Sequence, residues 1–251
     1  MHTDIEEAPR VMSLVGLVFS LIIILGLAGL LLGAVAGGLA LIDLGLNGWD
    51  HLIASLDLVS HLSRRDEGAE LLGFLLGCAI YAAVVVALAL ASRWRWGGRW
   101  LLEIGWRPLR PGSAYWGSVA LVMAYGVGAS LALSQFHATE HPVFTMPESW
   151  LGIGVSFLLI VVCAPLAEEW MFRGWIWAAL RPRGFRVALW TTALVFAAAH
   201  WGGTPLYSLA ILPIGLILGL LREKSGSTQA TSLCHALYNF LMWGLTFLGK
   251  A

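Results

Sequence analysis

The chain has 251 residues, of which 59% are hydrophobic and only 12% are charged, and its mean hydropathy is +0.79. A soluble globular domain carries about 25% charged residues, so this composition cannot cover a soluble surface and predicts a membrane protein. The net charge is zero, without a basic or acidic block, and we therefore expect no nucleic acid partner. Three widely spaced cysteines without a CxxC pair (Cys78, Cys163, Cys234) argue against a disulfide framework and against a cysteine–zinc site.

Seven apolar runs near the ~20 residues that cross hydrocarbon follow one another along the chain. They cover residues 11–42, 69–92, 115–134, 149–180, 187–201, 205–221 and 228–248. The first run is too long for one straight span, and its glycines at 33, 37 and 38 would allow a kink or a re-entrant end. Its length and its acidic flank argue against a cleaved signal peptide. The sequence therefore predicts an all-α fold, a polytopic transmembrane bundle of about seven (six to eight) helices, as a single membrane domain over residues 1–251.

The basic residues predict the orientation of these spans. Eleven of the 15 Lys and Arg residues lie in the amino-terminal tail and in the loops after the second, fourth and sixth runs. Seven alternating spans place all eleven on one side, which the positive-inside rule makes cytoplasmic. We expect a multi-pass protein of a plasma (inner) membrane, with its N-terminus in the cytoplasm and lipid as one partner. For so compact a chain we expect a bacterial source.

Polar residues inside membrane spans are costly to keep there and are typical of functional sites. Three such groups occur in the carboxyl-terminal runs: Glu168, Glu169 and Arg173 within "AEEWMFRGW"; Phe196 and His200 within "FAAAH"; and His235 and Asn239 within "HALYN". A spacing of four places both members of a pair on one helical face. Counted at 1.5 Å per residue from the predicted cytoplasmic ends, Glu168 and His200 lie at a depth of about 20 Å, Asn239 at about 17 Å and His235 at about 11 Å. The groups are therefore predicted to converge on one cavity.

Structural interpretations compete with a functional one. His200 could bind a neighbouring backbone group, and His235 with Asn239 could join two helices. For Glu169 and Arg173 we favour a structural i, i+4 pair, which leaves Glu168 about 100° around the helix and free to act. Pro165 removes a backbone hydrogen bond beside Glu168, which could kink the helix or admit water.

A glutamate beside histidines suits the activation of water, because the carboxylate takes a proton while imidazole and amide groups hold the water or stabilise an oxyanion. The same donors could bind a divalent metal such as zinc through Glu168, His200 and His235. The sequence contains no GxSxG, no HExxH and no Gly-rich phosphate loop. Both kinds of hydrolytic chemistry stay open at this point.

The ordered motifs EExxxR, FxxxH and HxxxN on successive hydrophobic runs resemble the CPBP family of intramembrane proteases. That family includes the type II CAAX prenyl endopeptidases and the bacterial Abi proteins linked to bacteriocin self-immunity. The resemblance covers a CPBP-like catalytic core at residues 150–248, and no motif position departs from the pattern.

The resemblance implies an intramembrane endopeptidase whose cavity opens toward the cytoplasm. Glu168 would activate water with the help of His200, while His235 and Asn239 would stabilise the oxyanion, and Glu169, Arg173 and Phe196 would support the site. We favour a glutamate-type mechanism that requires no cofactor, with a metal-dependent one as the alternative. Expected substrates are membrane-associated or secreted peptides or proteins rather than prenylated ones.

Two further classes of function remain. The chain could be a catalytically silent immunity or scaffold protein, in which the motif residues only hold helices together. It could also be a proton-coupled transporter, in which Glu168 and the histidines relay protons. The complete set of motifs favours an enzyme, and the absence of a repeat between two halves argues against a transporter.

Overall fold

The computed structural model describes residues 12–62, 67–135, 147–201 and 205–250, and every regular element in them is helical. In chain order the elements are α1 (Leu14–Leu62), α2 (Glu67–Trp96), η1 (Gly97–Arg99), α3 (Trp100–Glu103), α4 (Ser113–Gln135), α5 (Trp150–Phe157), η2 (Leu158–Cys163), α6 (Ala164–Glu169), η3 (Trp170–Ile176), α7 (Trp177–Leu180), η4 (Arg181–Arg183), α8 (Phe185–Ala199), α9 (Pro205–Ser225) and α10 (Thr228–Lys250). Within these residues five helices are long and apolar enough to cross a membrane. The predicted class, a polytopic helical membrane protein, is confirmed.

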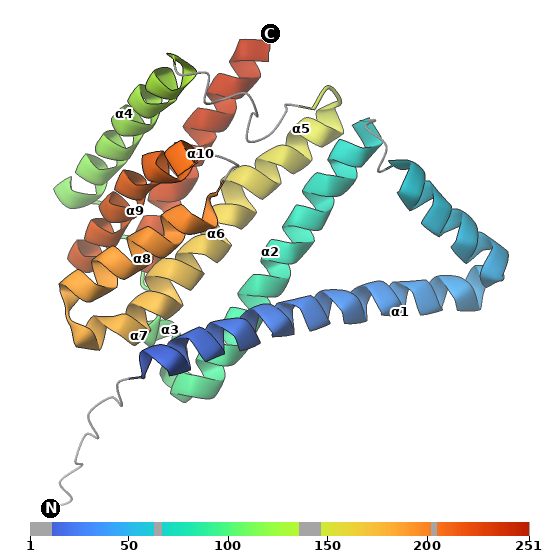
Figure 1. Ribbon diagram of the computed structural model, residues 1–251, viewed down its shortest axis with the longest axis horizontal. Helices are drawn as coiled ribbons and strands as arrows, with labels where there is room; N and C mark the ends of the chain where they lie inside the picture. The colour runs from blue at the N-terminus through green and yellow to red at the C-terminus, as the bar shows by residue number, and fades with distance from the viewer. Residues whose placement is uncertain (1–11, 63–66, 136–146, 202–204, 251) are drawn as a thin grey trace, which may run out of the picture.

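The segments from α5 to α7 form one continuous rod (Figure 1), which carries Glu168, Glu169 and Arg173. α2 packs along one side of this rod, and α10 and α8 pack on it from other directions. α9 then packs against α8, α10 and α4. The rod is therefore the central element of the bundle, which is why its Glu168–Arg173 segment meets residues from several helices.

The first helix differs from its prediction. α1 extends to Leu62, well beyond residue 42, and its break lies at Gly48 (φ 83°) rather than at the earlier glycines. It contacts α2 near its start and then leaves the bundle (Figure 1). Because this helix is apolar on all sides, no single face is marked for contact with protein. Its exposed faces suit lipid. The prediction of a kink within residues 33–38 was wrong.

Two of the predicted spans also differ from simple membrane helices. α8 has 15 residues, a length of about 22 Å, which is less than the hydrocarbon thickness of about 30 Å. It therefore ends inside the bundle, and His200 follows its last residue. α10 is 23 residues long. It is not one of the five helices that are long and apolar enough to cross a membrane, because it carries polar side chains toward the rod.

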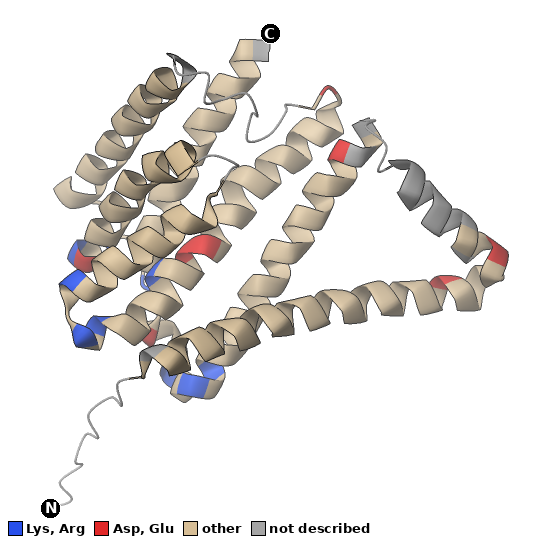
Figure 2. Ribbon diagram, viewed as in Figure 1, with Lys and Arg blue, Asp and Glu red and all other residues tan. Residues whose placement is uncertain are grey.

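The basic loops gather at one end of the bundle (Figure 2). There Arg181 pairs with Glu223 at 2.6 Å, and the Ser227 hydroxyl donates to the Arg107 carbonyl at 2.6 Å. This clustering agrees with the predicted arrangement of the spans. Arg10, Arg64 and Arg65, which also entered that prediction, lie outside the described residues.

Cysteine labelling in intact cells tests the orientation. In a variant without native cysteines, Arg99→Cys and Arg183→Cys should be protected from a membrane-impermeant thiol reagent, because the basic end is predicted to face the cytoplasm. Trp150→Cys, at the exposed start of α5 near the opposite end, should react. Strong labelling of Arg183→Cys from outside would reverse the orientation.

Candidate active site

The rod widens into π-helical turns on both sides of Glu168. The Ala164 N–H donates to the Leu159 carbonyl, five residues back. In the same register the Ile160 carbonyl would pair with the N–H of residue 165, but Pro165 has none. The Asn239 side-chain amide donates to the Ile160 carbonyl instead, at 2.8 Å. Pro165 therefore frees a backbone acceptor that α10 satisfies.

Three side chains spaced four residues apart on α10 reach the rod. His235 contacts Glu169, Asn239 binds Ile160, and Trp243 donates to the Ser156 hydroxyl at 3.1 Å. A spacing of four keeps all three on one helical face. This stripe explains why α10 is less apolar than the other long helices and fixes its register against the rod.

Glu169 and Arg173 form the predicted structural pair. Their side chains are fully buried, and Arg173 Nη1 lies 2.8 Å from Glu169 Oε1. Arg173 Nη2 donates to the Gly215 carbonyl at 2.9 Å, and its guanidinium carbon lies 4.4 Å from the centroid of the Phe196 ring. The cost of burying these charges is thus offset by pairing, backbone bonds and an aromatic face.

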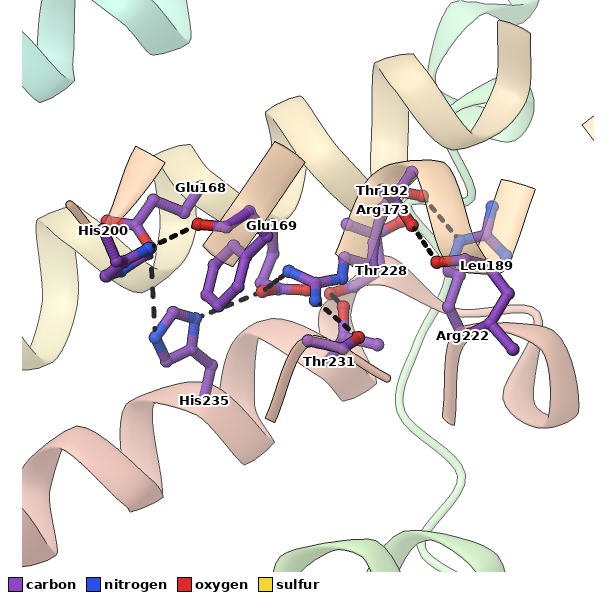
Figure 3. A network of polar contacts seen from close by, with 12 residues as sticks. Glu168, Glu169, Arg173, Leu189, Thr192, His200, Arg222, Thr228, Thr231 and His235 are labelled. Carbon is purple, nitrogen blue, oxygen red and sulfur yellow. Dashed lines mark hydrogen bonds and ion pairs between the residues drawn. The ribbon is translucent and has the colours of Figure 1, made fainter. Parts of the chain in front are cut away.

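The structure brings Glu168, His200 and His235 together (Figure 3). Glu168 Oε2 lies 3.6 Å from His200 Nε2 and 4.0 Å from His235 Nε2. These distances are longer than direct hydrogen bonds. A single water molecule can bridge such a separation. Glu168 Oε1, by contrast, accepts a hydrogen bond from the Tyr81 hydroxyl at 2.8 Å.

The hydrogen bond at Nδ1 of each imidazole determines whether its Nε2 atom faces Glu168 as a donor or as an acceptor. His200 Nδ1 lies 2.8 Å from the Phe196 carbonyl, and a carbonyl only accepts, so Nδ1 carries a proton. His235 Nδ1 lies 3.1 Å from the carboxylate of Glu169, which is paired with Arg173 and likewise accepts. In their neutral forms both rings therefore direct an Nε2 lone pair toward Glu168.

Phe196 joins these parts. Its ring is buried and lies 4.4 Å from the His200 ring and 5.7 Å from the His235 ring, measured between centroids. It also covers Arg173. Phe196 thus packs against Arg173 of the buried ion pair and against both imidazole rings.

Asn239 lies one turn beyond His235, and the hydrogen bond that the structure gives it goes to Ile160. Its convergence with Glu168 stays a prediction. A side-chain amide has two N–H groups, so the bond to Ile160 uses only one of them.

Sequence reasoning missed Tyr81. It lies on α2, far from the motifs, and the sequence does not say which helix packs beside Glu168. A signal was nevertheless present, because Tyr81 is the one tyrosine in residues 67–96 and a buried phenol hydroxyl requires a partner.

Glu168, His200 and His235 are the residues that would bind a catalytic zinc if one were used. The described part of the chain contains no group of three His, Cys, Asp or Glu side chains that is arranged to hold a metal ion. The metal-dependent alternative is tested by the chelation experiment below, and no step below is derived through a metal.

The fold and this cluster define a polytopic helical membrane protein with a partly buried glutamate between two histidines. Residues 150–241 match the Rce1-like family model, described as type II CAAX prenyl endopeptidase Rce1-like. The matched residues contain all three motifs, and the match supports their resemblance to the CPBP family of intramembrane proteases. No curated protein and no solved structure is significantly similar to the chain.

Proposed function

We propose that the protein is an intramembrane endopeptidase of the glutamate type, which cleaves membrane-associated or secreted peptides with an activated water. One observation carries this proposal: Glu168 Oε2 faces the Nε2 atoms of two histidines, whose other ring nitrogens are held by fixed acceptors. A scaffold would require only that these polar groups be satisfied, by direct hydrogen bonds. Here three groups that can each accept a proton lie at distances that one water molecule can bridge, and this arrangement suits the activation of water.

In the proposed reaction, Glu168 and His200 hold the attacking water. Its two hydrogens point to Glu168 Oε2 and His200 Nε2, so its lone pairs face the substrate carbonyl. Glu168 takes one proton as the water oxygen bonds to the carbonyl carbon. The same proton then passes from Glu168 to the leaving amine nitrogen as the peptide C–N bond breaks.

The oxyanion is assigned to His235 and Asn239. With its Nδ1 proton held by Glu169, His235 donates from Nε2 when the ring carries both protons. Asn239 contributes the N–H that does not bind Ile160. Oriented donors of this kind are worth about 10²- to 10³-fold in turnover.

The proposal is tested with purified protein and a library of membrane-associated peptides, with new termini identified by mass spectrometry. We expect cleavage that persists after treatment with a strong chelator. Loss of activity on chelation, restored by zinc, would replace the glutamate-type mechanism with the metal-dependent one. Failure to cleave any peptide, in vesicles as well as in detergent, would favour the scaffold. Proton flux across proteoliposomes without cleavage would favour the transporter.

A further inference from the structure

The Glu168 carboxylate is held by a residue outside the family match. We propose that Tyr81 of α2 is a positioning residue for the reaction: its hydroxyl fixes Glu168 Oε1, so that Oε2 stays aimed at the two histidines. This inference rests on the proposed function and deepens it, because it makes the amino-terminal half of the chain part of the active site.

The two oxygens of Glu168 have different surroundings. Oε1 accepts from the Tyr81 hydroxyl at 2.8 Å, a good hydrogen bond. Oε2 is buried and, among the described residues, receives no hydrogen bond. The Glu168 side chain is about 15% exposed. Tyr81 supplies the directional contact that distinguishes the two oxygens.

α2 is docked closely enough to hold Tyr81 in place. A Cβ at Gly77 would lie 2.8 Å from Leu159 Cδ2, so the absence of a side chain at Gly77 lets α2 approach the π-helical turn η2. Gly77 and Tyr81 are four residues apart and share a helical face. The close approach at Gly77 and the bond from Tyr81 to Glu168 therefore hold this face of α2 against the rod.

Loss of the Tyr81 hydroxyl should affect turnover more than substrate binding. Tyr81→Phe keeps the ring and its packing but lets the carboxylate rotate, and small errors in positioning a reacting group are costly. We expect kcat to fall about 10- to 100-fold, with KM changed less than about twofold. The acidic limb of the kcat profile should move to higher pH, because a donor that stabilises the charged carboxylate is lost.

Tyr125→Phe is the matched control. Its hydroxyl donates to the Ala210 carbonyl at 2.9 Å, so this variant also loses one partly buried phenol bond, but not one to Glu168. Both variants should lose similar thermal stability, and only Tyr81→Phe should shift the pH profile. Incorporation of 3-fluorotyrosine at position 81 should move the acidic limb of the kcat profile to lower pH, because a more acidic phenol is a stronger donor. If Tyr81→Phe folds poorly, this substitution tests the role of Tyr81 in its place.

The outcomes separate this inference from the proposed function. An active wild type, with Tyr81→Phe matching Tyr125→Phe in kcat and pH profile, would overturn the role of Tyr81 and leave the protease intact. A pH profile that 3-fluorotyrosine at position 81 leaves unchanged would also overturn the role of Tyr81. A wild type without activity would instead overturn the proposed function itself.

Discussion

Glu168→Gln should lower turnover by about 10²- to 10⁴-fold, the usual contribution of a general base. Glutamine keeps the size of the side chain and still accepts the Tyr81 hydrogen bond through its amide oxygen. It cannot take a proton from water. The folded state should therefore change little, and circular dichroism and thermal unfolding should match the wild type while peptide cleavage is lost.

Glu223→Gln provides the control for this substitution. It makes the same chemical change in an ion pair with Arg181 that is part-exposed and lies at the basic end of the bundle. Exposed pairs contribute about 0 to 1 kcal/mol, so both activity and stability should stay near the wild type. Full activity in Glu168→Gln would remove Glu168 from the role of base.

Glu169→Gln should act mainly through stability. It leaves the fully buried Arg173 without its charged partner, and breaking a buried pair from one side costs about 3 to 5 kcal/mol. The free energy of unfolding in detergent, measured by denaturant titration, should fall by that amount. The activity of the folded fraction should fall less, because the amide oxygen of glutamine can still accept from His235 Nδ1.

A double variant separates these two effects of Glu169. Glu169→Leu with Arg173→Met replaces both charges by apolar groups, and such replacements are often neutral for stability. We expect most of the lost stability to return while activity falls, because leucine leaves His235 Nδ1 without its acceptor. If the double variant lost as much unfolding free energy as Glu169→Leu and Arg173→Met lose together as single variants, the two charges would not stabilise each other.

The local features of this site could be predicted from the sequence because they depend on helical spacing alone. The pairing of Glu169 with Arg173 follows from their separation of four residues, and the placement of Glu168 on another face follows from 100° per residue. The meeting of Glu168 with His200 follows from depth, which hydropathy and basic loops together indicate. These expectations needed no knowledge of which helices touch.

The rest depends on tertiary packing and was not predictable in that way. Tyr81 reaches Glu168 because α2 lies beside the rod, and no spacing in the sequence encodes that neighbour. The bond between Asn239 and Ile160 requires the π-helical register that precedes Pro165. The break of α1 at Gly48 lies beyond the apolar run, in an Asn47–Gly48 pair that is typical of turns and that the hydropathy reading did not use.

The most direct test of the central claim, that Glu168 activates water for peptide hydrolysis, is cleavage in ¹⁸O-labelled water by wild type and Glu168→Gln side by side. The mechanism predicts that wild-type products gain one ¹⁸O at each new carboxyl terminus and that the variant produces no new termini above background. Equal cleavage by the two proteins, with the same label incorporated, would contradict it.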